Sequence, residues 1–456
     1  MRRVVKVSRI RIIITIIVVV LTTLLTGCTG KEPNEIAYVV ALGIDSTDDD
    51  NYKITIQYAN TTQISGGASE SGGKAGSEIV DNVTIEAPNI YAGVGLANNI
   101  VSKSFSMSHA KLIVFSKEIA EKGVKDMIET LVRSEEIRPD VFIAVANTTA
   151  NDYLTSVNPE MEVNPAQYYQ LIYQKNQLVG IPDGQLREFF TGLYTDNYDS
   201  IFPVAGVIEG SGGNSQNDDK GQSKDSQNEG SEGSSESLDS FESKSSNEKD
   251  ENEKEKDAEK NTSKYEYDIK NYVGGETAIE KKNKAEAIGA AVFEKDKMVG
   301  ELGEVETEIC KILKGDYTYS YLTYYNNDTP DIPITVKTTQ QKKPKYKIDT
   351  DKKTVDIELY IESDLYSLPA DYNVENKIED FERDVANYTS SACTEFINNF
   401  TKKYNSDILK LNEKIKYKFL TNNQYNWFKK NVGWSEYKFS VCTNFKVRRT
   451  GLIVRE

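Results

Sequence analysis

Candidate catalytic chemistry begins with His109, the single histidine among 456 residues. A Ser-His-acid triad or another general-base site could use this imidazole. One imidazole cannot build a site that needs two or three, which excludes the zinc hydrolases. His109 stands just before an apolar run that reads as a strand. We interpret it as a structural histidine that hydrogen-bonds the backbone at a helix–strand junction.

A second candidate is a run of four glutamates, Glu301, Glu304, Glu306 and Glu308. Helical spacing brings Glu301, Glu304 and Glu308 near one face, since residues three and four apart are neighbours on a helix. Such a face could hold an acid/base pair, or it could simply face solvent. We interpret it as a solvated helix face.

Four aspartates, Asp45, Asp48, Asp49 and Asp50, resemble a calcium loop only loosely. The glycine at the sixth position of such a loop is missing, and so is the distal glutamate. The sequence therefore predicts a solvated hairpin turn here and no metal site.

Glycine motifs for phosphate or nucleotide binding are incomplete. Gly73-Lys74 is followed by Ala75 and lacks the first glycine of a P-loop. The pair Gly93 and Gly95 is followed by Asn98 where a dinucleotide fingerprint has glycine, and no Gly-x-Ser-x-Gly elbow occurs. The sequence thus predicts no catalytic residue, no cofactor and no enzymatic activity.

Tyrosines are frequent, with 27 in the chain, and five of them cluster on one predicted strand. Tyrosine is favoured where one side of a ring is apolar and the other side is wet. Sheet packing and a contact surface for another protein both remain open. The cluster consists of Tyr317, Tyr319, Tyr321, Tyr324 and Tyr325.

The N-terminal segment has the pattern of a lipoprotein signal. Five basic residues precede an apolar run at 12–25, which is shorter than the about 20 residues that cross a bilayer as a helix. The run ends in Leu25-Thr26-Gly27-Cys28, which resembles the bacterial lipobox, where the cysteine takes the lipid and becomes the mature N-terminus. We expect a signal peptide at 1–27 and a lipid on Cys28, which tethers the protein to a membrane outside the cytoplasm. An uncleaved signal anchor is the alternative.

Charge and cysteine content limit the partners. The balance of 55 basic and 71 acidic residues gives −16, and removal of the five basic residues of 1–27 gives −16 − 5 = −21. We expect no nucleic-acid partner, because such proteins need a basic surface to neutralise phosphates. Besides Cys28, the chain has Cys310, Cys393 and Cys442, an odd number that cannot all pair. We expect buried free thiols, with Cys393 and Cys442 in or beside the core.

Residues 209–264 divide the chain. This segment holds 16 acidic and 8 basic residues with almost no apolar ones, so it cannot bury enough surface to offset chain entropy. We expect a disordered linker, with an acidic binding tail as the alternative. The expected domains are a signal peptide at 1–27, an N-terminal α+β domain at 28–208, the linker at 209–264, a middle segment at 265–330 and a C-terminal α+β domain at 331–456.

Hydrophobic periodicity before the linker predicts strands and helices in mixture. An apolar run at 38–44 and the alternation at 52–58 predict a hairpin. Apolar residues at 90–101 step by three and four, which predicts a helix. Short strands at 111–115 and 141–146 flank a second helix around 127–132.

Periodicity after the linker continues the mixture, and half-buried alternation favours antiparallel sheets. The fold class is therefore α+β, multi-domain, with mixed or antiparallel sheets, flanking helices and a long amphipathic helix in the C-terminal domain. The predicted elements are a hairpin at 287–299, a helix at 302–312, strands at 317–325, 331–336 and 355–361, the long helix at 374–400, and a closing strand at 437–447.

Several segments, taken in order, resemble the spore germination Ger(x)C lipoproteins. The order and spacing of these segments carry the resemblance over most of the chain outside the linker. The segments are Gly43-Ile44-Asp45 after the lipobox, 84–87, 108–115, 131–140, 290–302, 306–315 and 447–453.

This resemblance implies the C subunit of a nutrient germinant receptor, anchored by Cys28 at the outer surface of the spore inner membrane. It implies action by contact with two membrane proteins, an A subunit and a transporter-like B subunit. The nutrient, and whether this subunit binds a small molecule itself, stay open.

Two other functions are compatible with the residues. An extracytoplasmic solute-binding lipoprotein that feeds a transporter would need two lobes with parallel sheets around a cleft, against the alternation described above. A hydrolase would depend on His109 or on a carboxylate pair.

Overall fold

The computed structural model describes thirteen stretches of the chain, and all of them belong to one compact unit. The predicted linker and Cys28 lie outside the described residues. No helix within these stretches is both long and apolar enough to cross a membrane. The described stretches are 13–18, 35–49, 51–60, 80–157, 162, 164–174, 180–195, 198–208, 271–277, 284–326, 329–367, 377–404 and 406–449.

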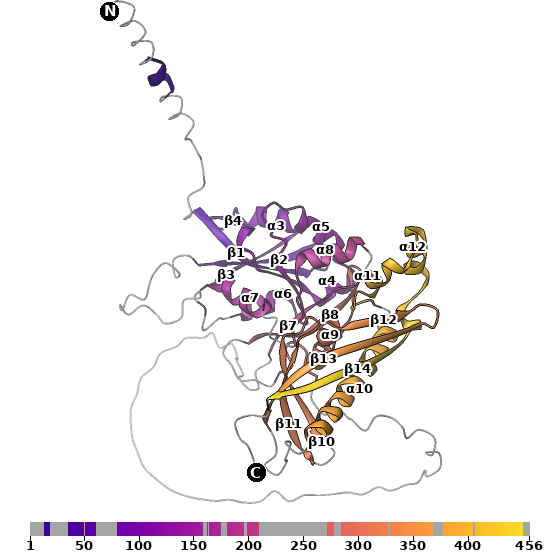
Figure 1. Ribbon diagram of the computed structural model, residues 1–456. Helices are drawn as coiled ribbons and strands as arrows, with labels where there is room; N and C mark the ends of the chain where they lie inside the picture. Colours follow the sequence, from indigo (N-terminus) through magenta and orange to yellow (C-terminus); the bar gives the residue numbers. More distant parts are fainter. Residues whose placement is uncertain are drawn as a thin grey trace, which may run out of the picture. The chain divides into compact units, whose positions relative to one another are not determined.

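A nine-stranded sheet has the order β3-β2-β1-β5-β6-β7-β8-β9, with β4 paired to β1 (Figure 1). The strands β1, β5, β6 and β7 are parallel, whereas both flanks of this block are antiparallel. Its strands are β1 (Ile36–Ser46), β2 (Tyr52–Ala59), β3 (Val80–Ala87), β4 (Ser104–Ser106), β5 (Leu112–Ser116), β6 (Phe142–Ala146), β7 (Ile201–Val207), β8 (Ala285–Glu294) and β9 (Lys297–Leu302).

Helices cover both faces of this sheet, and a separate buried core lies under each set. Strands β5 and β6 are apolar and buried along their whole length, as expected for parallel strands between two helical layers. One face carries α3 (Ile90–Ala97), α4 (Lys117–Lys122), α5 (Lys125–Val132) and α8 (Leu186–Thr195), and the other carries α6 (Ala150–Ser156) and α7 (Pro165–Tyr173).

A five-stranded sheet has the order β10-β11-β13-β12, and β14 pairs with β13 in parallel. The long helix α10 packs along β14 and buries Phe381, Val385 and Phe400 (Figure 1). The strands are β10 (Tyr319–Asn326), β11 (Thr329–Gln340), β12 (Lys345–Asp349), β13 (Thr354–Ser367) and β14 (Lys438–Arg449). The helices are α9 (Glu304–Lys314), α10 (Ile378–Tyr404), α11 (Leu411–Ile415) and α12 (Asn422–Asn431), with short 3-10 turns η4 (Lys416–Lys418) and η5 (Trp434–Glu436).

The predicted α+β class is confirmed, and so are the hairpins β1–β2 and β8–β9. The preference for antiparallel pairing is wrong for the centre of the first sheet and for β13–β14. In β5 and β6 there is no alternation, because both faces are covered by helices. In β14 one face is solvent-exposed, so the alternation says nothing about strand direction.

Candidate functional site

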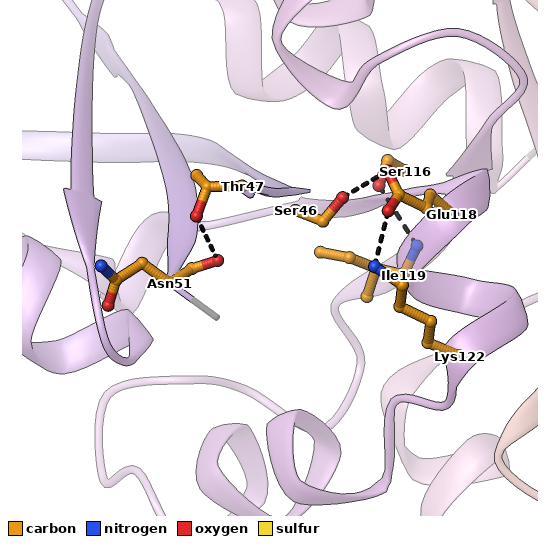
Figure 2. A network of polar contacts seen from close by, with 7 residues as sticks. All are labelled: Ser46, Thr47, Asn51, Ser116, Glu118, Ile119 and Lys122. Carbon is orange, nitrogen blue, oxygen red and sulfur yellow. Dashed lines mark hydrogen bonds and ion pairs between the residues drawn. The ribbon is translucent and has the colours of Figure 1, made fainter. Parts of the chain in front are cut away.

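The carboxyl ends of β1 and β5 form the edge where open α/β sheets usually bind ligands. Here the chain's own side chains occupy it (Figure 2). The hydroxyl of Ser46 donates to Glu118, and Lys122 Nζ lies 2.6 Å from Oε1 of the same carboxylate. Ser116 Oγ accepts from Ile119 N at 3.4 Å and thereby caps α4. This edge is therefore a structural junction.

Asp45 is the last residue but one of β1 and is buried. Its carboxylate accepts from Ala150 N at 2.6 Å and from Asn151 N at 3.0 Å, which joins β1 to the first turn of α6. Burial raises the pKa of Asp45, against the lowering effect of these two hydrogen bonds. The calcium-like aspartates thus separate, since Asp45 faces inward. No group of three or more metal-ligating residues occurs in the described part of the chain.

His109 is exposed at the end of η2 (Met107–His109), and its ring meets the ring of Tyr38 edge-on at 4.8 Å. The imidazole has no hydrogen bond to any residue within the described ranges, so the expected bond to the backbone is wrong. The hydroxyls of Ser106 and Ser108 lie 2.9 Å apart and pair with each other. The three residues do not form a nucleophile–base pair.

The predicted solvated helix face of glutamates is wrong for its first and last members. Glu301 lies on β9 and pairs with Lys117 at 2.9 Å, and Glu306 accepts from Gly303 N at 3.1 Å at the start of α9. Glu308 instead turns inward, and its Oε1 is shut off from solvent without a hydrogen bond. Burial raises the pKa of Glu308 to about 7, and the nearby Glu304 adds to this. Helical spacing grouped these residues, but packing of α9 against α10 decides which of them faces inward.

The three cysteines in the described part of the chain differ in their burial. Cys310 and Cys393 are buried and free, as expected, and burial raises their pKa values to about 11 and about 12. Cys442 is exposed, so its predicted place in or beside the core is wrong. Strand β14 buries Phe439, Val441 and every second residue after them, which turns position 442 to solvent.

The tyrosines of the cluster lie on both faces of the second sheet. Tyr324 is buried against the rings of Phe381 and Tyr388 of α10, at 5.7 and 5.9 Å. On the opposite face Tyr321 is 53% exposed and meets Tyr366 of β13, itself 59% exposed, at 5.5 Å. The outward pair Tyr321 and Tyr366 is therefore a candidate contact surface.

Two hollows border the segment that follows α10. One, of about 590 Å³, has four lysines and two acids among its lining residues, and burial lowers the pKa of Lys414 there. The other, of about 620 Å³, contains Asp407 and Asp199 beside Trp434. Asp407 accepts from Leu411 N at 2.7 Å and Asn412 N at 2.8 Å, and burial raises its pKa to about 7.

Sequence reasoning missed this segment. Residues 414–435 contain five lysines and no acid, interleaved with aromatic residues, and that pattern could have identified it.

Comparison of the sequence with protein families gives two matches, one on each side of residues 209–264. Residues 30–207 match the family model described as the spore germination protein N-terminal domain, and residues 288–451 match the one described as spore germination B3/GerAC like, C-terminal.

Curated relatives come from Bacillus subtilis (strain 168). Spore germination protein KC is 26% identical over 174 residues, 35% of this chain and 42% of that protein. The putative spore germination protein YfkR is 28% identical over 145 residues, 32% of this chain and 37% of that protein. The chain thus spans less than half the length of these relatives. The crystal structure of the GerBC protein aligns with a TM-score of 0.47 and 15% identity, covering 89% of this chain and 96% of that one.

Proposed function

The chain belongs to the GerAC family of spore germination proteins, and on this basis we propose that it is the C subunit of a spore nutrient germinant receptor. The observation that carries the proposal is the match of both family domains, in order, on either side of residues 209–264. The subunit acts by contact with the A and B membrane subunits and catalyses no reaction itself.

Membrane attachment through Cys28 is part of this proposal. The lipobox that ends in Cys28 supports this attachment. One acyl chain binds a membrane only weakly, whereas two or more chains anchor a protein firmly. Strand β1 begins at Ile36, eight residues later, and eight extended residues reach at most about 30 Å. The first sheet would therefore stay close to the outer surface of the spore inner membrane.

Deletion of the gene is expected to abolish germination with one class of nutrient while growth and sporulation continue. A copy with Cys28→Ser should restore this response poorly, because the subunit leaves the membrane fraction. The measurement is the loss of optical density of spores after each nutrient, with membrane fractionation of the subunit. Normal germination of the deletion strain with every nutrient would refute the proposed function.

Subunit contact through the outward tyrosines gives a second prediction. Tyr321→Ser with Tyr366→Ser should reduce recovery of the A and B subunits with this chain by at least about tenfold, since buried aromatic anchors are each worth about 2 kcal/mol at interfaces. The double variant should melt like the wild type, because both rings are exposed. Tyr194→Ser on α8 is the matched control, with a ring 50% exposed. Equal recovery with both variants would place the contact elsewhere.

A further inference from the structure

The segment 414–435 reverses the charge of the rest of the chain. It carries Lys414, Lys416, Lys418, Lys429 and Lys430 and no acidic residue, in a chain whose net charge is −16. Without these five lysines the remaining residues carry −16 − 5 = −21. A basic patch on an acidic protein attracts a negatively charged surface only locally, so it also fixes which side of the protein approaches.

Inner aromatic residues hold this segment on the protein. The ring of Phe419 lies 5.7 Å from the ring of Tyr425 and 5.1 Å from the ring of Phe428. The ring of Phe428 in turn lies 6.0 Å from the ring of Trp434. The indole of Trp434 also donates to Asn412 Oδ1 at 3.2 Å. The position of η4 and α12 is therefore set by a packed core beneath them.

Outer apolar residues of the same segment have no such role. Tyr417 is 81% exposed, Leu420 93% and Trp427 65%, whereas Tyr425 and Phe428 of α12 are buried. Large apolar side chains exposed to this degree cost free energy in water, about 2 kcal/mol each relative to burial. They gather on the turn and helix that also carry the lysines.

The lysines lie beside these exposed side chains and keep their charge available. Lys416, Lys418 and Lys430 are exposed, and none forms an ion pair with a carboxylate in the described ranges. Lys418 donates to the carbonyl of Ile348, a neutral acceptor. The hollow beside Tyr417 adds Lys343 and Lys410. Three carboxylates lie near the patch, Asp316 and Glu413 in that hollow and Asp349 close to Lys418, but the lysines outnumber them, so the patch stays positive.

We propose that this basic aromatic surface, Lys416–Leu420 with Trp427 and Lys430, docks on an anionic lipid bilayer. Tryptophan and tyrosine favour the headgroup region, and each lysine near an anionic bilayer contributes about 1 kcal/mol. Projecting side chains enter a soft lipid surface readily, whereas a protein partner would have to offer a matching pocket for each. The surface would hold the C-terminal sheet at the membrane independently of the lipid on Cys28.

Vesicle binding by the unacylated chain tests this inference. The chain from residue 28 onward with Cys28→Ser retains every strand and helix named above. It is expected to sediment with vesicles of phosphatidylcholine and phosphatidylglycerol and to remain in solution with phosphatidylcholine alone. Leu420→Ser with Trp427→Ser should weaken binding at least about tenfold, since each loses burial worth about 2 kcal/mol. Lys416→Glu with Lys418→Glu should abolish it, and added salt should weaken it.

Matched controls separate this surface from general stickiness. Leu96→Ser with Ile100→Ser removes exposed apolar side chains on and beside α3, 48% and 70% exposed, and should leave vesicle binding unchanged. Only two tryptophans are present and Trp434 is buried, so a blue shift of emission on anionic vesicles reports Trp427. No sedimentation with anionic vesicles would overturn the inference and favour a protein partner. Binding that neither Leu420→Ser with Trp427→Ser nor Lys416→Glu with Lys418→Glu weakens would do the same. A failed receptor assignment would leave this result unaffected, because the assay contains no other subunit.

Discussion

Replacement of Asp45 by alanine is expected to lower the free energy of unfolding by about 3 kcal/mol, because one buried and one partly buried N–H group would each lose a partner at a cost of about 1–3 kcal/mol. The donors are Ala150 N and Asn151 N, at 2.6 and 3.0 Å from the carboxylate. Urea unfolding followed by circular dichroism measures this change. Spores that carry the variant should respond to the nutrient as weakly as a deletion strain, since a loss of this size depletes a marginally stable protein.

The reason lies in how tightly α6 approaches the first sheet. A Cβ at Gly43 would stand 3.0 Å from Leu154 and 3.1 Å from Ala150, so glycine lets α6 lie this close to β1 without displacing those side chains. Asn151 also donates to Thr55 at 2.9 Å. The short motif Gly43-Ile44-Asp45 thus provides a close approach, a core side chain and a helix cap in three consecutive residues.

Asp45→Asn is the matched control. The amide keeps one acceptor oxygen and the same shape. The loss of unfolding free energy should therefore be smaller for Asp45→Asn than for Asp45→Ala, and the two losses should differ by about 1–2 kcal/mol. Equal stability of wild type and Asp45→Ala would contradict the role of this carboxylate as the link between β1 and α6.

The local elements of this fold were predictable, and the contacts across long sequence distances were not. Alternation at 52–58 predicted β2 because one period-two face is buried whatever the neighbouring strand is. The bond from Asp45 to Ala150 spans 105 residues, and no local pattern encodes it. The GerAC resemblance rests on the order and spacing of short segments, which identify the family without assigning contacts between them.

Two errors at single positions show the same limit. Cys442 was misplaced although Phe439, Val441 and Phe445 already set the phase of the strand, so the alternation itself would have put position 442 outside. Glu308 could not be placed by spacing, because α9 has neighbours on more than one side and its packing partner α10 begins some seventy residues later. The lysine-rich segment 414–435 was visible in the sequence as a charge reversal, yet its exposure depends on the aromatic core below it.

Stability that falls between mildly acidic and alkaline pH is the second large effect expected. Burial holds the pKa of Glu308 at about 7 in the folded chain, against an ordinary value of 4.5. Below pH 4.5 both folded and unfolded chains bind this proton, and the group costs nothing. As pH rises from 4.5 to about 7, only the folded chain retains the proton, so the free energy of unfolding falls; above about 7 the folded carboxyl also ionises and the fall levels off.

Glu308→Gln should remove this loss. At pH 8 the variant is expected to be more stable than the wild type by roughly 3 kcal/mol, and at pH 4 about equal to it, since one unit of pKa shift corresponds to about 1.4 kcal/mol. Thermal or urea unfolding at several pH values gives the measurement. Glu379→Gln on the exposed start of α10 is the control and should change stability by less than about 0.5 kcal/mol at any pH.

Asp407 limits how much of the pH dependence a single variant can remove. Burial raises its pKa to about 7 as well, from 3.8, so its effect has the same sign. Glu308→Gln should therefore flatten the wild-type curve only in part, and Glu308→Gln with Asp407→Asn should flatten it further, because asparagine still accepts one of the bonds from Leu411 N and Asn412 N. A stability difference between wild type and Glu308→Gln that is the same at pH 4 and pH 8 would mean that Glu308 titrates normally. The carboxyl would then reach water, and α9 would not close over it against α10.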